Sequence, residues 1–331
     1  MEKLSGRQKR ISDRAPADWV RFGWQGISCL TPPDWSLGAI GGEYKQGYLR
    51  LDDGSRPRLE VRWNKQEADL SRTVDKYLKS LGKPRRGLRL RRNPAIAAKR
   101  DVRIVSQRAK PNKRMEGFAW SEGEELHCAG VIWVCKDCGR TVIAQVRSYG
   151  KEEAVALAQE VLATLEDHAV EGRISWALYG LESEVPEGYA LKSQSLMAGY
   201  LELAFLKGKR RLRISRWGLA ENMLANTDLK EWFETRLARS KREIRWQAQE
   251  LGLKDHIGLE ITGFTRKIPQ QLQRLALTGA RRMIGKKAPL PPEGLGKVWY
   301  CPESNRIYLV ECVQDPETAV LEEVTESIVC H

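Results

Sequence analysis

The stretch from Trp19 to Trp63 decides the fold, because the chain contains it twice. The first copy reads WVRFGWQGISCLTPPDWSLGAIGGEYKQGYLRLDDGSRPRLEVRW, and the second reads ISWALYGLESEVPEGYALKSQSLMAGYLELAFLKGKRRLRISRW, from Ile174 to Trp217. Ungapped matches join Val20, Phe22, Gly26, Ile27, Pro32, Trp35 and Leu37 to Ile174, Trp176, Gly180, Leu181, Pro186, Tyr189 and Leu191. Chance similarity between β-rich stretches does not give ordered matches over about 45 residues, so the repeat indicates a duplicated domain.

The apolar pattern of each copy predicts a sheet with helices. Alternation predicts strands near 20–24, 27–30, 48–51, 59–63, 126–135 and 140–147. Helical spacing predicts helices over about 70–81 and 151–166, and in the second half around 229–237 and 320–328. The predicted class is therefore α+β, with two homologous domains that are each an antiparallel sheet with packed helices.

Three segments divide the chain. Residues 1–18 are polar and basic, which is typical of a mobile N-terminal arm. The first α/β repeat, with arginine-rich loops, covers 19–168, and the second repeat covers 173–331. The linker between the two repeats is short.

The order of motifs in each repeat resembles the PsbP-like α/β fold. An apolar run is followed by Pro32, a spacer and Trp35, then by Gly-x-Leu-x-Leu at 47–51 and Arg-Leu-x-Val-x-Trp at 58–63. The resemblance covers most of each half. That superfamily contains many binding proteins and few enzymes, so the resemblance implies a binding protein.

Composition favours a folded protein with an anionic partner. The 331 residues carry a net charge of +13, with 41% hydrophobic and 30% charged residues. No apolar run approaches the roughly 20 residues of a membrane span. The N-terminus has no hydrophobic region typical of a signal peptide. We therefore expect a cytoplasmic protein with no membrane partner.

The positive charge is concentrated between Lys83 and Arg114. This run holds thirteen basic residues and one acid, Asp101, and arginine dominates it. We expect it to form loops around one short strand near Val102–Val105. The planar guanidinium suits phosphate, and like charges this crowded repel one another unless an anion relieves them. The run predicts nucleic-acid binding, with a solvated basic loop as the alternative.

Smaller basic clusters in the second half extend this prediction. The candidate nucleic-acid-binding residues are Lys83, Arg85, Arg86, Arg89, Arg91, Arg92, Lys99, Arg100, Lys113, Arg114, Lys207, Lys209, Arg210, Arg211, Arg281, Arg282, Lys286 and Lys287. The two halves therefore share a scaffold and present different charged surfaces, either as two docking sites or through drift after duplication.

The cysteines do not predict a metal site. Cys135-x-x-Cys138 resembles a zinc knuckle, but the second repeat has Ser304 where Cys138 would fall. His127 and Cys128 are adjacent on a strand, so their side chains point to opposite faces. We expect no metal, no cofactor, and free or disulfide-bonded thiols.

Catalytic motifs are also missing. The segment 279–287 superficially resembles a phosphate loop, but its glycine spacing is one residue too long and Lys287 stands where Ser or Thr should follow. The sequence has no nucleophile elbow, dinucleotide fingerprint or metalloprotease helix. A non-enzyme without a small-molecule substrate is expected.

The overall plan resembles the archaeal two-domain ribosome hibernation factors, the dual ribosomal subunit inhibitors. The features that carry this resemblance are the tandem α/β units, the arginine-rich loops and the lack of catalytic residues. It implies an RNA-binding factor that contacts ribosomal RNA and both ribosomal subunits and inhibits translation sterically. The alternatives are a DNA- or chromatin-associated protein and an assembly subunit that binds an acidic protein.

Overall fold

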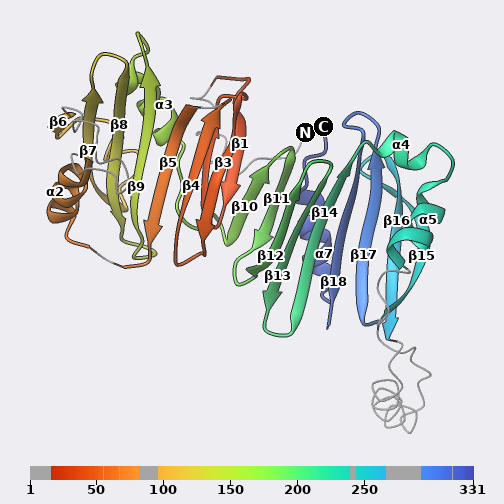
Figure 1. The fold of residues 1–331 in the computed structure, drawn as a ribbon. Helices are drawn as coiled ribbons and strands as arrows, with labels where there is room; N and C mark the ends of the chain where they lie inside the picture. The colour runs from red at the N-terminus through yellow and green to blue at the C-terminus, as the bar shows by residue number, and fades with distance from the viewer. Residues whose placement is uncertain are drawn as a thin grey trace, which may run out of the picture. The chain divides into compact units, whose positions relative to one another are not determined.

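The computed structural model describes residues 16–54, 56–66, 68–81, 96–238, 244–265, 292–314 and 316–331 (Figure 1). The chain divides into two compact units, Met1–Tyr179 and Gly180–His331. Most of the predicted N-terminal arm and the arginine-rich residues 83–92 lie outside the described residues.

Unit 1 is built on an antiparallel sheet of seven strands in the order β3-β4-β5-β9-β8-β7-β6. A smaller layer is formed by β1, which pairs with β2 and with β10. The elements are β1 Val20–Trp24, β2 Ile27–Thr31, β3 Trp35–Gly42, β4 Gln46–Asp53, β5 Arg56–Asn64, α2 Leu70–Leu81, β6 Ile96–Arg100, β7 Lys113–Glu122, β8 Leu126–Cys135, β9 Thr141–Tyr149, α3 Ala154–Ala163 and β10 Arg173–Leu178.

Unit 2 repeats this sheet strand for strand, in the order β12-β13-β14-β18-β17-β16-β15. Among the described residues, one helix, α2, follows the third strand of the sheet in unit 1, whereas two short helices and a π-helical turn follow it in unit 2. The elements are β11 Leu181–Pro186, β12 Ala190–Met197, β13 Tyr200–Lys207, β14 Arg210–Gly218, α4 Ala220–Leu224, α5 Leu229–Trp232, η1 Phe233–Ala238, β15 Ile244–Leu253, β16 His256–Thr265, β17 Gly294–Cys301, β18 Arg306–Val313 and α7 Thr318–Ser327.

The predicted α+β class is wrong, because the structure is mostly β. Of the residues that the structure describes, strands hold 55% and helices 17%. The predicted helices are present but short, whereas long strands such as β7 and β15 were missed. These strands are rich in Glu, Gln, Lys, Arg and Ala, which have low strand propensity, so pairing with neighbouring strands rather than local preference makes them extended.

One predicted strand is also misplaced. The short strand expected near Val102–Val105 is an irregular segment, and the strand lies just before it, at β6. Ile104 and Val105 are buried, so the apolar run that suggested a strand reflects burial alone.

The core of unit 1 lies on both faces of its central strands. Helix α2 buries Val74 against Phe118, Trp120 and Ile132 of β7 and β8. Helix α3 packs against β8 and β9. Trp120 is 6% exposed and donates from its indole nitrogen to Gln145, so it is a core residue and is not available to stack on a base.

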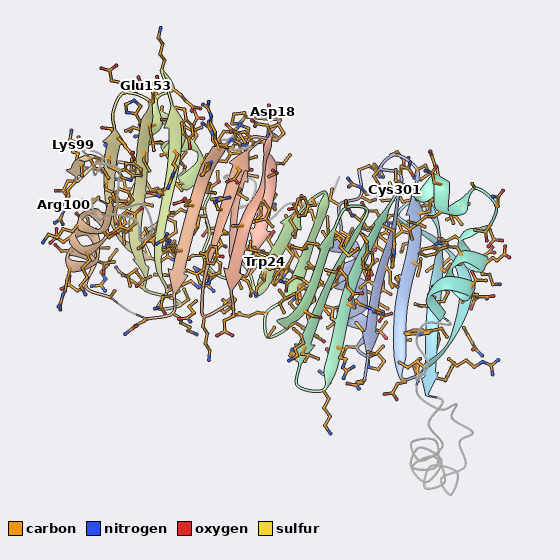
Figure 2. All side chains as sticks on the ribbon, viewed as in Figure 1. Asp18, Trp24, Lys99, Arg100, Glu153 and Cys301 are labelled. Carbon is orange, nitrogen blue, oxygen red and sulfur yellow. The ribbon has the colours of Figure 1, made fainter. Side chains whose placement is uncertain are left out.

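Several other tryptophans are core residues as well. Trp133 and Trp299 are fully buried in the two units. Trp24, labelled in Figure 2, packs edge-on against Trp176 of β10, with ring centroids 5.2 Å apart. Among the described helices, none has the length and apolar character required to cross a membrane.

The close approach of β8 to its neighbours requires glycine at position 130. A Cβ atom there would lie 2.4 Å from the carbonyl oxygen of Ala144 and 2.6 Å from the ring of Phe118. We expect Gly130→Ala to destabilise the protein by about 1–3 kcal/mol, because backbone and ring must both shift. Chemical denaturation measures the change. Gly252→Ala is the control, since its Cβ would meet nothing within 4 Å. Equal stability of both variants would contradict the prediction.

Candidate functional site

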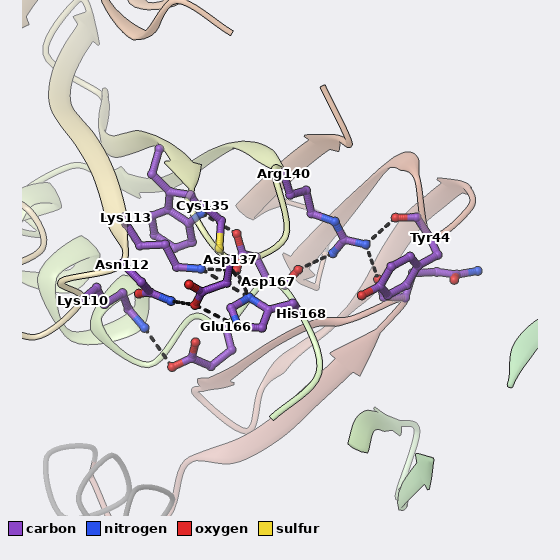
Figure 3. A network of polar contacts seen from close by, with 12 residues as sticks. Tyr44, Lys110, Asn112, Lys113, Cys135, Asp137, Arg140, Glu166, Asp167 and His168 are labelled. Carbon is purple, nitrogen blue, oxygen red and sulfur yellow. Dashed lines mark hydrogen bonds and ion pairs between the residues drawn. The ribbon is translucent and has the colours of Figure 1, made fainter. Parts of the chain in front are cut away.

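A buried polar cluster lies where β7 begins and β8 ends in unit 1 (Figure 3). Lys113 and Cys135 are cross-strand partners at this end of the sheet. The segment 166–168, which follows α3, meets the two strands there and brings a glutamate, an aspartate and a histidine to them. Three parts of the chain far apart in sequence therefore supply the cluster.

The carboxylate of Asp167 is the centre of this cluster. It accepts hydrogen bonds from the ammonium of Lys113 and, at 2.8 Å, from the indole of Trp133. The Nδ1 atom of His168 lies 2.7 Å from its Oδ1 atom. Asp167 is 0% exposed and Lys113 is 1% exposed, so water solvates neither charge.

These contacts fix the charge state of the pair. Burial by itself raises the pKa of Asp167, but the hydrogen bonds from His168, Lys113 and Trp133 outweigh it and hold the pKa at about 2. The bond to Asp167 raises the pKa of His168 to about 9. At neutral pH the cluster therefore contains a carboxylate, an ammonium and an imidazolium.

Two further cations hold the segment 166–168, one through the side chain of Glu166 and one through the backbone of Asp167. Lys110 is buried and donates to Glu166 at 3.0 Å. Arg140 is 1% exposed and donates to the carbonyl oxygens of Asp167, Gln25 and Tyr44. Burial lowers the pKa of Arg140. The segment after α3 is thus joined to β7, to the turn after β1 and to the turn after β3.

Two thiols complete the cluster. Cys135 is buried, with its Sγ atom 3.7 Å from Nδ1 of His168. Hydrogen bonds from Cys138 and His168 hold the pKa of Cys135 well below its usual range. The donor atoms of Cys135, Cys138, Asp167 and His168 all lie within 4.8 Å of one another, and so do those of His256, Cys301, Cys330 and His331 in unit 2.

The structure removes some cations from the predicted nucleic-acid surface. Lys113 is buried against Asp167, so its assignment to phosphate binding is wrong. Lys110, which belongs to the same basic run, is buried as well. Arg100 contacts two carboxylates, Asp75 at 2.5 Å and Glu116 at 2.6 Å. Counting charges in the sequence therefore overestimates the free positive charge of the run.

Other predicted residues lie at the surface. Lys99 is on the edge strand β6 (Figure 2), and Arg114 is exposed on β7. In the hairpin β13–β14 the exposed residues are Lys207, Lys209 and Arg211, whereas Arg210 forms an ion pair with Glu317. The remaining candidates, Lys83, Arg85, Arg86, Arg89, Arg91, Arg92, Arg281, Arg282, Lys286 and Lys287, lie outside the described residues.

Sequence reasoning missed both four-residue clusters. The signal that was available is the pair of residues ending each repeat, Asp167-His168 and Cys330-His331, which match in position after the last helix. His256 carries no such signal, because it is 74 positions from Cys330 along the chain and contacts it only in the folded protein.

Comparisons with known proteins assign no family to this chain. No family model and no curated protein matches it. Among solved structures, it is similar to the immunity protein TplEi of the type VI secretion system of Pseudomonas aeruginosa, with 12% identity and a TM-score of 0.34 over 94% of this chain and 97% of that one. It is also similar to MucB, with 10% identity and a TM-score of 0.19 over 98% and 96% of the two chains. Likenesses this weak do not bear on function.

The buried pair leads to a stability prediction. Asp167→Asn leaves the ammonium of Lys113 buried without a counter-charge, so we expect a loss of about 3–5 kcal/mol in the free energy of unfolding. The measurement is urea denaturation of the full chain. Asp137→Asn is the matched control, because the side chain of Asp137 is 57% exposed.

A second variant separates charge from shape. Adding Lys113→Met to Asp167→Asn removes the unpaired ammonium and should recover part of the loss. The interpretation fails if Asp167→Asn and Asp137→Asn destabilise the protein equally.

Proposed function

We propose that this protein is a non-catalytic, cytoplasmic RNA-binding factor that associates with the ribosome and inhibits translation by occupying its subunits. The observation that carries the proposal is the concentration of charge between Lys83 and Arg114, where thirteen basic residues face one acid. Polyanion binding by such a surface gains free energy from the release of condensed counterions. Ribosomal RNA is the polyanion that the overall plan of the chain favours.

Exposed cations within the described part of the run support the proposal. Lys99, Arg103 and Arg108 are exposed. The two arginines belong to the irregular segment 101–108, which lines an open groove of about 660 Å³ with part of β7. A groove next to exposed guanidinium groups suits the phosphate backbone of an extended strand.

The equivalent hairpins of the two units differ in charge, which supports different binding sites for the two units on the partner. The β4–β5 hairpin of unit 1 carries Asp52 and Asp53 near its tip, and the equivalent β13–β14 hairpin of unit 2 carries Lys207 and Lys209. Arg50 and Arg58 form ion pairs with the two aspartates, whereas both lysines are exposed. Homologous hairpins that differ in exposed charge cannot bind the same phosphate surface equally well. Two different sites on one large ribonucleoprotein fit this asymmetry.

Salt dependence tests the electrostatic part of the proposal. We expect replacement of Lys99, Arg103 and Arg108 by Ala to reduce the slope of log affinity against log salt by about 0.7–0.9 for each phosphate that the protein no longer neutralises. Fluorescence anisotropy with single-stranded RNA measures the slope. The control replaces Lys192, Lys230 and Arg245, which are exposed in unit 2, and removes the same charge. Equal slopes for the two variants would move the site away from the basic run.

Sucrose-gradient sedimentation tests the partner. The wild-type chain should co-sediment with ribosomal subunits, and the triple variant of the basic run should do so more weakly at the same salt. A chain that binds duplex DNA as tightly as ribosomes at equal salt would favour the chromatin alternative. A chain that stays at the top of the gradient and binds acidic proteins would favour the assembly alternative.

A further inference from the structure

The polar cluster of unit 1 has a positional counterpart in unit 2. In unit 1, Lys113 starts β7 opposite Cys135 at the end of β8. In unit 2, His256 starts β16 and Cys301 ends β17. Gly258 pairs with Trp299, and the same register, extended by two residues, places His256 opposite Cys301. The third and fourth positions follow the last helix of each unit, as Asp167-His168 after α3 and Cys330-His331 after α7.

The residue types at two of these positions differ. Lysine and aspartate in unit 1 correspond to His256 and Cys330 in unit 2, while a cysteine and a histidine are kept at the other two positions. Unit 2 therefore has no ammonium and no carboxylate at these four positions. It has two thiols and two imidazoles, the donor set that zinc prefers in structural sites.

The spacing of the four donors in unit 2 fits a single tetrahedral ion. Nδ1 of His331 lies 3.4 Å from Sγ of Cys301 and 3.4 Å from Sγ of Cys330. Nε2 of His256 lies 3.5 Å from Sγ of Cys330. A tetrahedral zinc ion with Zn–S of about 2.3 Å and Zn–N of about 2.0–2.1 Å separates its sulfur and nitrogen ligands by about 3.5 Å.

Three of the four donor residues are buried, and the fourth, His331, is exposed. Cys301 is 0%, Cys330 8% and His256 9% exposed. Lys254, in the turn before β16, donates to the carbonyl oxygens of Glu326 and Ile328 at 2.8 and 2.6 Å. Val329 donates its backbone N–H to Glu182 at 3.1 Å. The contacts of Lys254 hold the segment that carries the last two ligands next to the start of β16, and the contact of Val329 holds it against β11. Such outer contacts keep metal ligands oriented.

We propose that unit 2 binds one zinc ion through His256, Cys301, Cys330 and His331. Four protein ligands fill the tetrahedral sites, so the ion is structural and leaves no open position for a substrate or a reactive water. The ion joins the start of β16, the end of β17 and the segment after α7. At the equivalent place in unit 1, the ion pair of Lys113 with Asp167 connects the sheet to the segment after α3.

Unit 1 should bind no zinc at the equivalent place. The ammonium of Lys113 is bonded to Asp167 and lies 3.4 Å from Nδ1 of His168, so it already supplies the positive charge among these donors. A divalent ion at Cys135, Cys138 and His168 would be repelled by that ammonium. At equivalent places, the positive charge is therefore the ammonium of Lys113 in unit 1 and a bound zinc ion in unit 2.

Metal content of the full chain tests the proposal. We expect about one equivalent of zinc, by mass spectrometry of protein purified with its affinity tag removed. Cys301→Ser and His256→Lys should lose the zinc. The second variant introduces the lysine that unit 1 has at the equivalent position, Lys113. His256→Cys should keep it, because thiolate is also a zinc ligand. Cys138→Ser is the matched control in unit 1 and should keep both the zinc and the thermal midpoint of the wild type.

Cobalt substitution provides a readout that does not depend on how stable the variants are. The wild-type protein reconstituted with Co²⁺ should show the visible bands of tetrahedral cobalt and thiolate-to-cobalt charge transfer. A chelator should remove the bands and lower the thermal midpoint of the wild type.

Three results would overturn the proposal. Wild-type protein that takes up neither zinc nor cobalt under reducing conditions would show that the four residues form only a hydrogen-bonded cluster. Zinc that survives both Cys301→Ser and His256→Lys would place the ion elsewhere. A second equivalent that is lost in Cys138→Ser would refute the assignment of the unit 1 position to Lys113.

Discussion

The buried charge of Asp167 is the constraint on which the rest of unit 1 depends. A carboxylate with no exposure is costly unless donors surround it, and Lys113, Trp133 and His168 do so. Lys113 lies in β7, Trp133 lies in β8, and His168 belongs to the segment that follows α3. The arrangement is possible only when β7, β8 and the chain after α3 are in register, so the ion pair selects one packing of helix on sheet.

Duplication kept this junction and changed its chemistry. Both units close at the same end of the sheet, where a cysteine of the fifth strand in the sheet order meets a histidine that follows the last helix. In unit 1 an ammonium and a carboxylate satisfy each other there. In unit 2 two imidazoles and two cysteine sulfurs occupy the four positions, a donor set that suits a soft or borderline cation.

The same junction alters how the basic charge of the chain should be counted. Two lysines of the run between Lys83 and Arg114 neutralise carboxylates inside unit 1, and Arg100 contacts two more at the edge of the sheet. Arg140, outside the run, donates to backbone carbonyls. Net charge favours an anionic partner, but only the exposed cations, such as Lys99, are accessible to one.

The sequence by itself determined the repeat, the strands with regular alternation such as Arg56–Asn64, and the helix from Leu70 to Leu81. These features are local, because periodicity along one segment reports which face is buried. Only the tertiary structure decided the mostly β character, since edge strands such as β15 have polar sequences and become extended by pairing. It also decided the two clusters. Lys113 and Asp167, or His256 and Cys330, are more than fifty residues apart, and a spacing along the chain carries no information about a contact made across a sheet end.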